Sequence, residues 1–433
     1  MNNLFKRLLL ICLICFYTPI SYAELTIEIT KGIDTAVPIA VVPFGWRTQG
    51  TELQPPLNLA SVIQNDLSGS GLFKTLPEND MLTQPTEVEN VRYRNWKALG
   101  QDYLLIGMVT KETERYKVQF QLFDIFKGVQ LLGYRLTVSK RNLRRAAHHI
   151  SDVVYQKLTG RKGVFNTRIA YITSGVKTDK QKIYKLLIAD ADGYNPRTIT
   201  SSLEPLMSPA WSVDGKKIAY VSFENKHSAI YVQTLTTGKR ERVAAFKGIN
   251  GAPAFSPDGS KLAITLSRDG SPDIYVLDLN SKILRKITRS YAIDTEPSWS
   301  PDGSMIVYTS DRGGQPQLYL IPSVGGNPTR LTYDGNYNTR AQFSADGQSI
   351  VLVHGNQGDY RIAIMDMATR TINVLTAGRF DESPSFAANG DMILYAAHKY
   401  GKSVLSSISV DGRMERRLSF DKGDVREPAW SRK

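Results

Sequence analysis

Five carboxylate or amide side chains recur at a nearly constant interval in the second half of the chain, and oxygen ligands of this kind can bind calcium. Each directly precedes a glycine and lies in a separate repeat, so none has the dense D-x-D-x-D-G spacing of a calcium loop. Sequences such as Ser256-Pro257-Asp258-Gly259 are instead typical of a tight type I turn between two strands. We therefore predict turn residues and no metal site at Asp214, Asp258, Asp302, Asp346 and Asn389.

The cysteines and the paired histidines also have spacings that suggest chemistry. Cys12 and Cys15 have the C-x-x-C spacing of a redox pair, but both lie in the apolar run 8–17, and neither follows the small residue that a lipoprotein signal requires. His148 and His149 are neighbours on a predicted helix and therefore point to different sides of it. We predict no thiol chemistry in the mature chain, no joint histidine metal site, and exposed or partly packed histidines.

Catalytic and nucleic-acid-binding signatures are weak. The sequence contains no G-x-S-x-G, no H-E-x-x-H and no P-loop, and only five histidines. The formal net charge of +13 comes from scattered lysines and arginines, which favour a solvated surface over a phosphate track. We predict no catalytic residue, no cofactor and no nucleic acid. A calcium-dependent propeller enzyme of the lactonase or sugar dehydrogenase type, or a carbohydrate-binding module, remains the alternative, because its ligands come from scattered loops.

The first residues have the three-part pattern of a secretory signal. Lys6 and Arg7 precede the apolar run 8–17, and Ser21-Tyr22-Ala23 places small residues at the positions that a signal peptidase requires. The sequence predicts a signal peptide at residues 1–23, with cleavage between Ala23 and Glu24. No later stretch is long and apolar enough for a transmembrane helix, so we expect an exported chain without a membrane span.

The turns belong to a longer repeat. A motif of the type P-A-W-S-P-D-G recurs with separations of 44, 44, 44, 43 and 44 residues between its aromatic positions. A period of about 40–50 residues is typical of propeller blades with four strands each. We expect the repeated aromatic side chains to pack between neighbouring blades, and these are Trp211, Phe255, Trp299, Phe343, Phe386 and Trp430.

The ends of the repeat determine the number of blades. Five motifs open complete four-strand units, three further strands precede them between residues 168 and 202, and one strand follows them in the sequence EPAWSRK. Three strands plus one make a sixth blade, so the last strand should be the innermost strand of the first blade. This closure removes the open sheet edge that would invite pairing with another chain.

The sequence thus predicts an α+β multidomain chain, with a small α/β domain followed by an all-β six-bladed propeller closed by the C-terminal strand. In the front part, strands alternate with an amphipathic helix around residues 143–158. The predicted boundaries are an N-terminal extended segment at 24–34, the α/β domain at 35–162 and the propeller at 163–433.

Several phrases resemble the TolB family, the periplasmic component of the Tol–Pal system. They are PIAVVPFGW, VYQKLTGRKGVFNTRIAY, LMSPAWSVDGKKIAYVSFE and NGAPAFSPDGSKLA, and the resemblance spans the mature chain. It implies a periplasmic scaffold that binds the peptidoglycan-associated lipoprotein Pal and the inner-membrane protein TolA. It also implies a role in outer-membrane integrity and in constriction at cell division, and use by colicins for import. We expect a monomer.

The family places Pal at the propeller mouth, in the loops that lead into each inner strand. Ile249 departs from the family pattern, because a histidine is typical at this position of the enterobacterial phrase. The residues that the resemblance assigns to Pal binding are Met207, Ser208, Asn250, Gly251, Ala252, Asp294, Thr295, Glu296, Thr339, Arg340, Asp381, Glu382, Arg426 and Glu427.

The mature N-terminus resembles the TolA-binding strand of the family. Its alternating apolar residues could dock by adding a strand to the sheet edge of a partner. We hypothesise a switch in which the segment bound to its own protein favours Pal, and the released segment favours TolA. The residues assigned to TolA binding are Glu24, Leu25, Thr26, Ile27, Glu28, Ile29, Thr30 and Asp34.

Overall fold

The structure is a computed structural model that describes residues 36–176, 181–356, 358–399, 401–418 and 424–432, and the backbone alone of residues 28–31. The predicted signal peptide, its cleavage site between Ala23 and Glu24, and positions 24–27 and 32–35 lie outside the described residues. Among the described residues, no helix is both long enough and apolar enough to cross a membrane.

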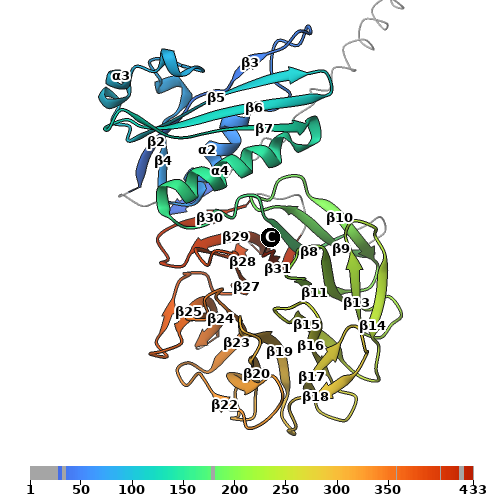
Figure 1. The fold of residues 1–433 in the computed structure, drawn as a ribbon. Coiled ribbons are helices and arrows are strands. Elements are labelled where there is room, and N and C mark those ends of the chain that lie inside the picture. The colour runs from blue at the N-terminus through green and yellow to red at the C-terminus, as the bar shows by residue number, and fades with distance from the viewer. Residues whose placement is uncertain are drawn as a thin grey trace, which may run out of the picture.

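The N-terminal domain is a mixed sheet with helices on both faces (Figure 1). Its strand order is β4-β2-β5-β6-β7, with β3 paired to the far part of β5. Helix α4 buries Ala147, Ile150 and Val154 with α2 against one face, and α3 buries Trp96 on the other face. The elements are β2 (Val37–Val41), β3 (Gly45–Arg47), α2 (Leu59–Gly69), β4 (Phe73–Thr75), α3 (Tyr93–Ala98), β5 (Tyr103–Glu112), β6 (Arg115–Asp124), β7 (Val129–Ser139) and α4 (Leu143–Thr159), with 3-10 turns at Glu78–Asp80, Val88–Asn90 and Lys140–Asn142.

The rest of the chain forms six antiparallel sheets arranged around one axis, which confirms the predicted six-bladed propeller (Figure 1). Blade 1 contains β8 (Arg168–Val176), β9 (Lys182–Asp190), β10 (Arg197–Ser202) and β31 (Asp424–Trp430). Blade 2 contains β11 (Leu206–Trp211), β12 (Lys217–Ser222), β13 (Ala229–Thr234) and β14 (Arg240–Ala244), and blade 3 contains β15 (Asn250–Phe255), β16 (Lys261–Leu266), β17 (Asp273–Asp278) and β18 (Leu284–Lys286).

The remaining blades follow the same order from the inner to the outer strand. Blade 4 contains β19 (Asp294–Trp299), β20 (Met305–Ser310), β21 (Gln317–Pro322) and β22 (Thr329–Arg330), and blade 5 contains β23 (Tyr337–Phe343), β24 (Ser349–Asn356), β25 (Asp359–Asp366) and β26 (Ile372–Val374). Blade 6 contains β27 (Glu382–Phe386), β28 (Met392–Lys399), β29 (Lys402–Ser409) and β30 (Glu415–Arg417), and β1 (Glu28–Lys31) adds a fifth strand to it.

The repeated aspartates hold the turns, as predicted. In blade 2 the hydroxyl of Ser212 donates to Asp214 Oδ1 at 2.7 Å, and the amide of Lys217 donates to Ser212 Oγ at 2.8 Å. Hydrogen bonds from the Ser256 hydroxyl and from Ser260 lower the pKa of Asp258 to about 2. The carboxylates are therefore charged hydrogen-bond acceptors inside their own turns.

The repeated aromatic residues pack between blades, as predicted. The ring of Trp211 is buried among side chains of blades 1 and 2, and Trp299 is buried among those of blades 3 and 4. Their indole nitrogens donate to carbonyl groups of the preceding inner strands, from Trp211 to Ala429 at 3.1 Å and from Trp299 to Ala254 at 3.0 Å. A buried indole thus fixes the spacing of adjacent blades and satisfies its own donor.

The closing strand lies where the sequence predicted it. Strand β31 pairs antiparallel with β8 as the innermost strand of blade 1 (Figure 1). In this pairing Trp430 lies opposite Ile169. Trp430 is 8% exposed, and its indole donates to Thr167 Oγ1 at 2.8 Å. The amide of Ser431 donates to the Arg168 carbonyl at 2.8 Å. The two ends of the propeller segment are therefore joined by strand pairing.

Candidate functional site

The inner strands all begin at one mouth of the propeller, where each has an unusual backbone conformation. Near its start, each inner strand has one residue other than glycine with a positive φ, between 45° and 56°. Where the inner strand pairs with its neighbour, the register shifts around this residue, as in a β-bulge. Left-handed residues other than glycine are uncommon and are concentrated at functional sites. The six residues are Ser208, Ala252, Glu296, Arg340, Ser383 and Glu427.

These six residues line a central channel of about 220 Å³. Arg340 lies between two carboxylates, with its Nε 3.1 Å from Glu296 Oε1 and its Nη2 3.7 Å from Glu427 Oε1. Burial alone would lower the pKa of Arg340, but the charges of Glu296 and Glu427 outweigh burial and raise it. The guanidinium therefore stays charged and ties blade 5 to blades 4 and 1.

Several residues assigned to the mouth have side chains that are turned inward. Asn250, Asp294, Thr339 and Asp381 are all under 5% exposed. The amide of Asn250 donates to the Phe246 carbonyl at 2.7 Å. At these four positions the mouth loops cover the side chains, and a buried polar group needs a partner inside the protein.

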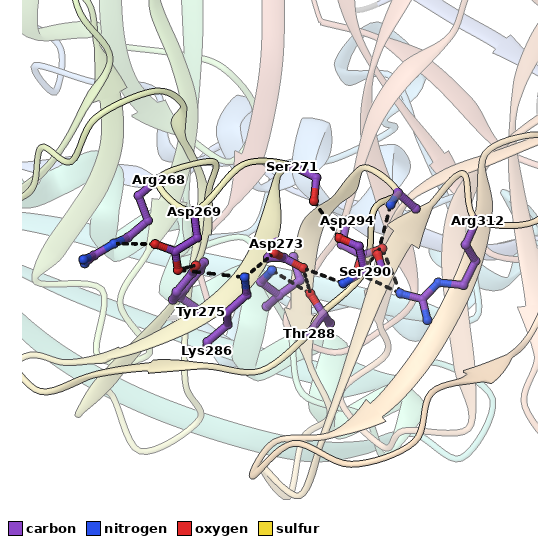
Figure 2. Close-up of polar contacts among 12 residues, drawn as sticks. Arg268, Asp269, Ser271, Asp273, Tyr275, Lys286, Thr288, Ser290, Asp294 and Arg312 are labelled. Carbon is purple, nitrogen blue, oxygen red and sulfur yellow. Dashed lines mark hydrogen bonds and ion pairs between the residues drawn. The ribbon is translucent and has the colours of Figure 1, made fainter.

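In the loop between β18 and β19, inward-facing carboxylates form hydrogen bonds and ion pairs within the protein (Figure 2). Arg312 Nη2 donates to both carboxylate oxygens of Asp294 at 2.9 and 2.8 Å, and the hydroxyl of Ser290 donates to Asp294 Oδ2 at 3.2 Å. On the other side of the loop, the ammonium of Lys286 lies 2.7 Å from Asp273 Oδ2. These contacts fix both ends of the loop that carries the fully exposed Tyr291.

Exposed apolar side chains lie at the mouth in the connections that lead into blades 2 to 6, and only Met207 among them was assigned from the sequence. Each of these residues lies in a connection from an outer strand to the next inner strand or at the start of that inner strand. They range from 38% exposed for Met207 to fully exposed for Tyr291. Apolar residues a few positions ahead of the first five repeat motifs were the sequence signal that could have revealed them. The set is Leu203, Met207, Ile249, Tyr291, Ile293, Tyr333 and Phe380.

The other assigned mouth residues are accessible to different degrees. Met207 and Arg426 are exposed. Half-buried positions surround the channel, and they are Ser208, Gly251, Ala252, Thr295, Glu296, Arg340, Glu382 and Glu427. The structure therefore brings all fourteen assigned positions to one end of the propeller. Ten of them are exposed or half-buried, and nine of these ten have a side chain, because one is Gly251.

The N-terminal segment is paired with the propeller where it is described. Strand β1 pairs antiparallel with β30, with Glu28 opposite Arg417 and Ile29 opposite Arg416. Residues 24–27 and Asp34, which the sequence analysis also assigned to this segment, lie outside the described residues. The pairing extends blade 6 by one strand at its outer edge.

The N-terminal domain contacts the propeller at the end opposite to the mouth. Tyr155 donates to Asp391 Oδ2 at 2.7 Å, and Asn389 donates to the Lys162 carbonyl at 2.9 Å. Arg144 pairs with Asp192, in the β9–β10 turn. These turns lie at the ends of the blades opposite to the mouth, so the contacts of the N-terminal domain that the structure describes here lie away from the mouth.

His148 lies inside this domain contact, so the expectation of an exposed or partly packed side chain was wrong for it. It is 2% exposed, and its Nδ1 lies 2.8 Å from Asp66 Oδ2, which also accepts from Ser151 at 2.7 Å. His149 is exposed, as expected. Burial alone would lower the pKa of His148, but Asp66 and Asp192 outweigh burial and Arg144 and raise it.

Asp66, His148 and Asp192 place ligand atoms within 4.8 Å of one another, a spacing that a metal ion could bridge. Two guanidinium groups interact with these carboxylates. Arg144 forms an ion pair with Asp192, and the buried Arg416 interacts electrostatically with Asp192 and Asp66. Positive charge is therefore already supplied to both carboxylates. We interpret the cluster as an ionic contact between the two domains.

Replacing His148 by glutamine is expected to destabilise the protein more at pH 6 than at pH 9. The pKa of His148 is higher in the folded protein than in the unfolded chain, where it is about 6.5. Protonated His148 therefore stabilises the fold fully at a pH below the unfolded pKa, and this stabilisation is lost as the pH rises through the folded pKa. Loss of this charged hydrogen bond should cost roughly 1–3 kcal/mol at pH 6, measured by urea unfolding. His149→Gln is the matched control and should change stability by less than about 0.5 kcal/mol. An equal effect of His148→Gln at both pH values would contradict a charged histidine.

Comparison with known proteins adds an independent observation. Residues 25–131 match the family model of the TolB amino-terminal domain, and residues 155–433 match that of the TolB beta propeller domain. A Tol-Pal system protein TolB from Nitrosococcus oceani is 59% identical over 96% of this chain and 95% of its own length. Another from Thioalkalivibrio sulfidiphilus is 58% identical over 100% of this chain and 98% of its own length. A crystal structure of TolB from Acinetobacter baumannii superposes with a TM-score of 0.86 at 42% identity, covering 94% of this chain and 100% of that one.

Proposed function

The chain belongs to the TolB family of the Tol–Pal system, and on this premise we propose that it is a periplasmic, non-catalytic scaffold that binds Pal at the propeller mouth and TolA through its mature N-terminus. In this role it supports outer-membrane integrity and constriction at cell division. The observation that carries the proposal is the mouth, where exposed apolar residues from five connecting loops accompany a charged channel at the end opposite to the N-terminal domain.

The mouth has the composition of a protein-binding surface. Stable interfaces combine a few large apolar or aromatic anchors with charged groups that set orientation and association rate. Tyr291, Ile293 and Phe380 supply the anchors, and Glu382 and Arg426 supply accessible charge. Ile249 is 51% exposed, so this loop offers a partner an apolar contact.

The channel gives less support to the alternative of a propeller enzyme or sugar-binding module. Three of the four charged residues that line it are paired with one another, since Arg340 contacts both Glu296 and Glu427, and Glu296 Oε2 accepts from Thr309 at 3.0 Å. The fourth, Arg432, is exposed. These pairs fix the inner strands. A substrate-binding role would require them to separate.

Two substitutions at the mouth test the Pal assignment. Tyr291→Ala should weaken binding of the soluble Pal domain by roughly 30-fold or more, because it removes an aromatic anchor. Glu382→Lys should weaken binding by about 10-fold and mainly slow association, because it reverses an accessible charge. Both effects are measurable by titration calorimetry and surface plasmon resonance.

Matched controls lie in the N-terminal domain. Leu53→Ala removes a side chain that is 94% exposed, and Glu114→Lys reverses an exposed charge in the β5–β6 turn. Neither should change Pal affinity. If Tyr291→Ala and Glu382→Lys leave Pal affinity unchanged in folded protein, the mouth is not the Pal site. Glu296→Lys is a poorer test, because Glu296 also holds Arg340.

The N-terminal segment carries the second part of the proposal. When β1 is paired with β30, one edge of this short strand is already occupied. Binding of this segment to TolA by strand addition therefore competes with its docking on blade 6. We propose that the docked segment favours Pal and the released segment favours TolA, so that each partner changes the affinity for the other.

A further inference from the structure

Strand β7 forms the open edge of the N-terminal sheet. In the sheet order β4-β2-β5-β6-β7 it is the last strand, and within the described chain its outer edge has no partner strand. It is 11 residues long and contains no proline. Natural proteins usually shorten, charge or cover such an edge, because its free amide and carbonyl groups are ready to pair with another strand.

The helix-side face of β7 is an incompletely covered apolar row. Leu132, Leu136 and Val138 pack partly buried against the core of the domain, and Tyr134 contacts the ring of Phe120 at a centroid distance of 5.8 Å. Tyr134 is nevertheless 56% exposed. An additional strand beside β7 would place its alternate side chains next to this row and complete its burial.

The opposite face and the following helix carry an excess of positive charge. Between Ile125 and Ser151 the chain has six lysines and arginines and no aspartate or glutamate. Lys127 and Arg144 pair with aspartates outside this stretch. Four exposed arginines and lysines form no ion pair with any described residue, and these are Arg135, Lys140, Arg141 and Arg145.

From these observations we infer that β7 is a docking edge for an extended acidic segment of a partner polypeptide. Apolar residues of the partner would lie beside Tyr134 and Leu136 on the helix side, and alternate carboxylates would face Arg135 on the opposite side. A carboxylate at the end of the segment would face Lys140 and Arg141, which directly follow β7. Main-chain hydrogen bonds would supply affinity, and the charges would set register and orientation. This site is separate from the mouth and from β1, so it does not depend on the proposed binding of Pal or TolA.

A second copy of the chain fits this edge less well. Antiparallel pairing of β7 with itself about its centre would place Arg135 of one copy close to Arg135 of the other. Like charges placed across strands are destabilising. These charges therefore disfavour self-association while leaving the edge open to an acidic strand.

The test uses the mature full-length chain and a short fluorescent peptide in which valine and glutamate alternate. Hydrogen exchange should show slower exchange of amides within residues 132–139 when the peptide is added. Arg135→Glu combined with Arg141→Glu should weaken the peptide roughly 10-fold in fluorescence anisotropy, since each exposed pair contributes up to about 1 kcal/mol. Arg242→Glu, an exposed residue on the edge strand β14 of the propeller, is the matched control and should have no effect.

Further measurements distinguish strand addition from membrane binding and from self-association. A peptide of the same sequence with N-methylated backbone amides should lose protection of β7, because it cannot donate ladder hydrogen bonds. Equal binding of the methylated peptide, or absence of protection at residues 132–139, would overturn the docking edge. Binding to phosphatidylglycerol vesicles without peptide binding would overturn it in favour of a membrane surface. Concentration-dependent dimerisation through β7 in sedimentation would overturn it in favour of a second copy.

Discussion

Removal of residues 424–433 is expected to abolish the cooperative unfolding transition of the propeller. This deletion removes β31, the inner strand of blade 1, together with the buried side chains of Val425 and Trp430. Loss of each large buried side chain costs roughly 2–5 kcal/mol, and a whole domain is stable by only about 5–15 kcal/mol. The edge of β8 that pairs with β31 would also be left open. Denaturant unfolding followed by circular dichroism, with dye binding to exposed apolar surface, would measure this effect.

Two matched variants distinguish the effect of losing the closing strand from the effect of shortening the C-terminus. A chain that lacks only Arg432 and Lys433 keeps β31 and should unfold like the full-length protein. Trp430→Phe keeps most of the buried volume but removes the indole donor to Thr167, so it should cost less than the deletion. A truncated protein that unfolds with the wild-type midpoint would show that ring closure is unimportant for stability.

A disulfide between β1 and β30 is expected to abolish TolA binding when oxidised and to restore it when reduced. Glu28 and Arg417 are directly opposed, and directly paired strand residues have Cα separations of about 4.5–5.5 Å, within the range of a disulfide. The only natural cysteines are Cys12 and Cys15, in the predicted signal peptide, so Glu28→Cys with Arg417→Cys would be the only pair in the mature chain. We expect at least about a 100-fold difference in TolA affinity, the loss that follows when the binding-competent state falls to about 1% of molecules.

The locked protein also tests the coupling to Pal. Pal affinity should be unchanged or higher in the oxidised form, because the lock holds the segment in the state proposed to favour Pal. Glu28→Ser with Arg417→Ser is the control for the loss of the two charged side chains, and it should respond to neither oxidant nor reductant. Equal TolA affinity in the oxidised and reduced forms would show that release of β1 is not required for TolA binding.

The repeat made much of the propeller predictable. Blade number and closure follow from the spacing of the aromatic positions and from the unmatched strands at the two ends, because each four-strand unit needs all its strands. The turn at Asp258 was predictable because its hydrogen bonds are formed within a few residues. Interactions between residues that are close in the sequence can be predicted from residue type and spacing.

Features that depend on contacts between distant residues were not predictable. His148 is buried because the Asp192 turn of the propeller and Asp66 of α2 close over α4, and no periodicity of the helix encodes that contact. Asp294 was expected to face a partner, but Arg312, from the same blade, binds it inside the protein. The placement of β1 on β30 likewise depends on how the chain packs in three dimensions.

Hydrogen exchange of the mature protein with and without the soluble Pal domain is the most direct test of the mouth assignment. We predict slower exchange in the loops that enter the inner strands, around residues 203–208, 246–252, 288–296, 332–340 and 376–383, with no change in the Asp-Gly turns at the opposite end. Protection confined to those turns or to the N-terminal domain, or no protection at saturating Pal, would contradict the mouth assignment.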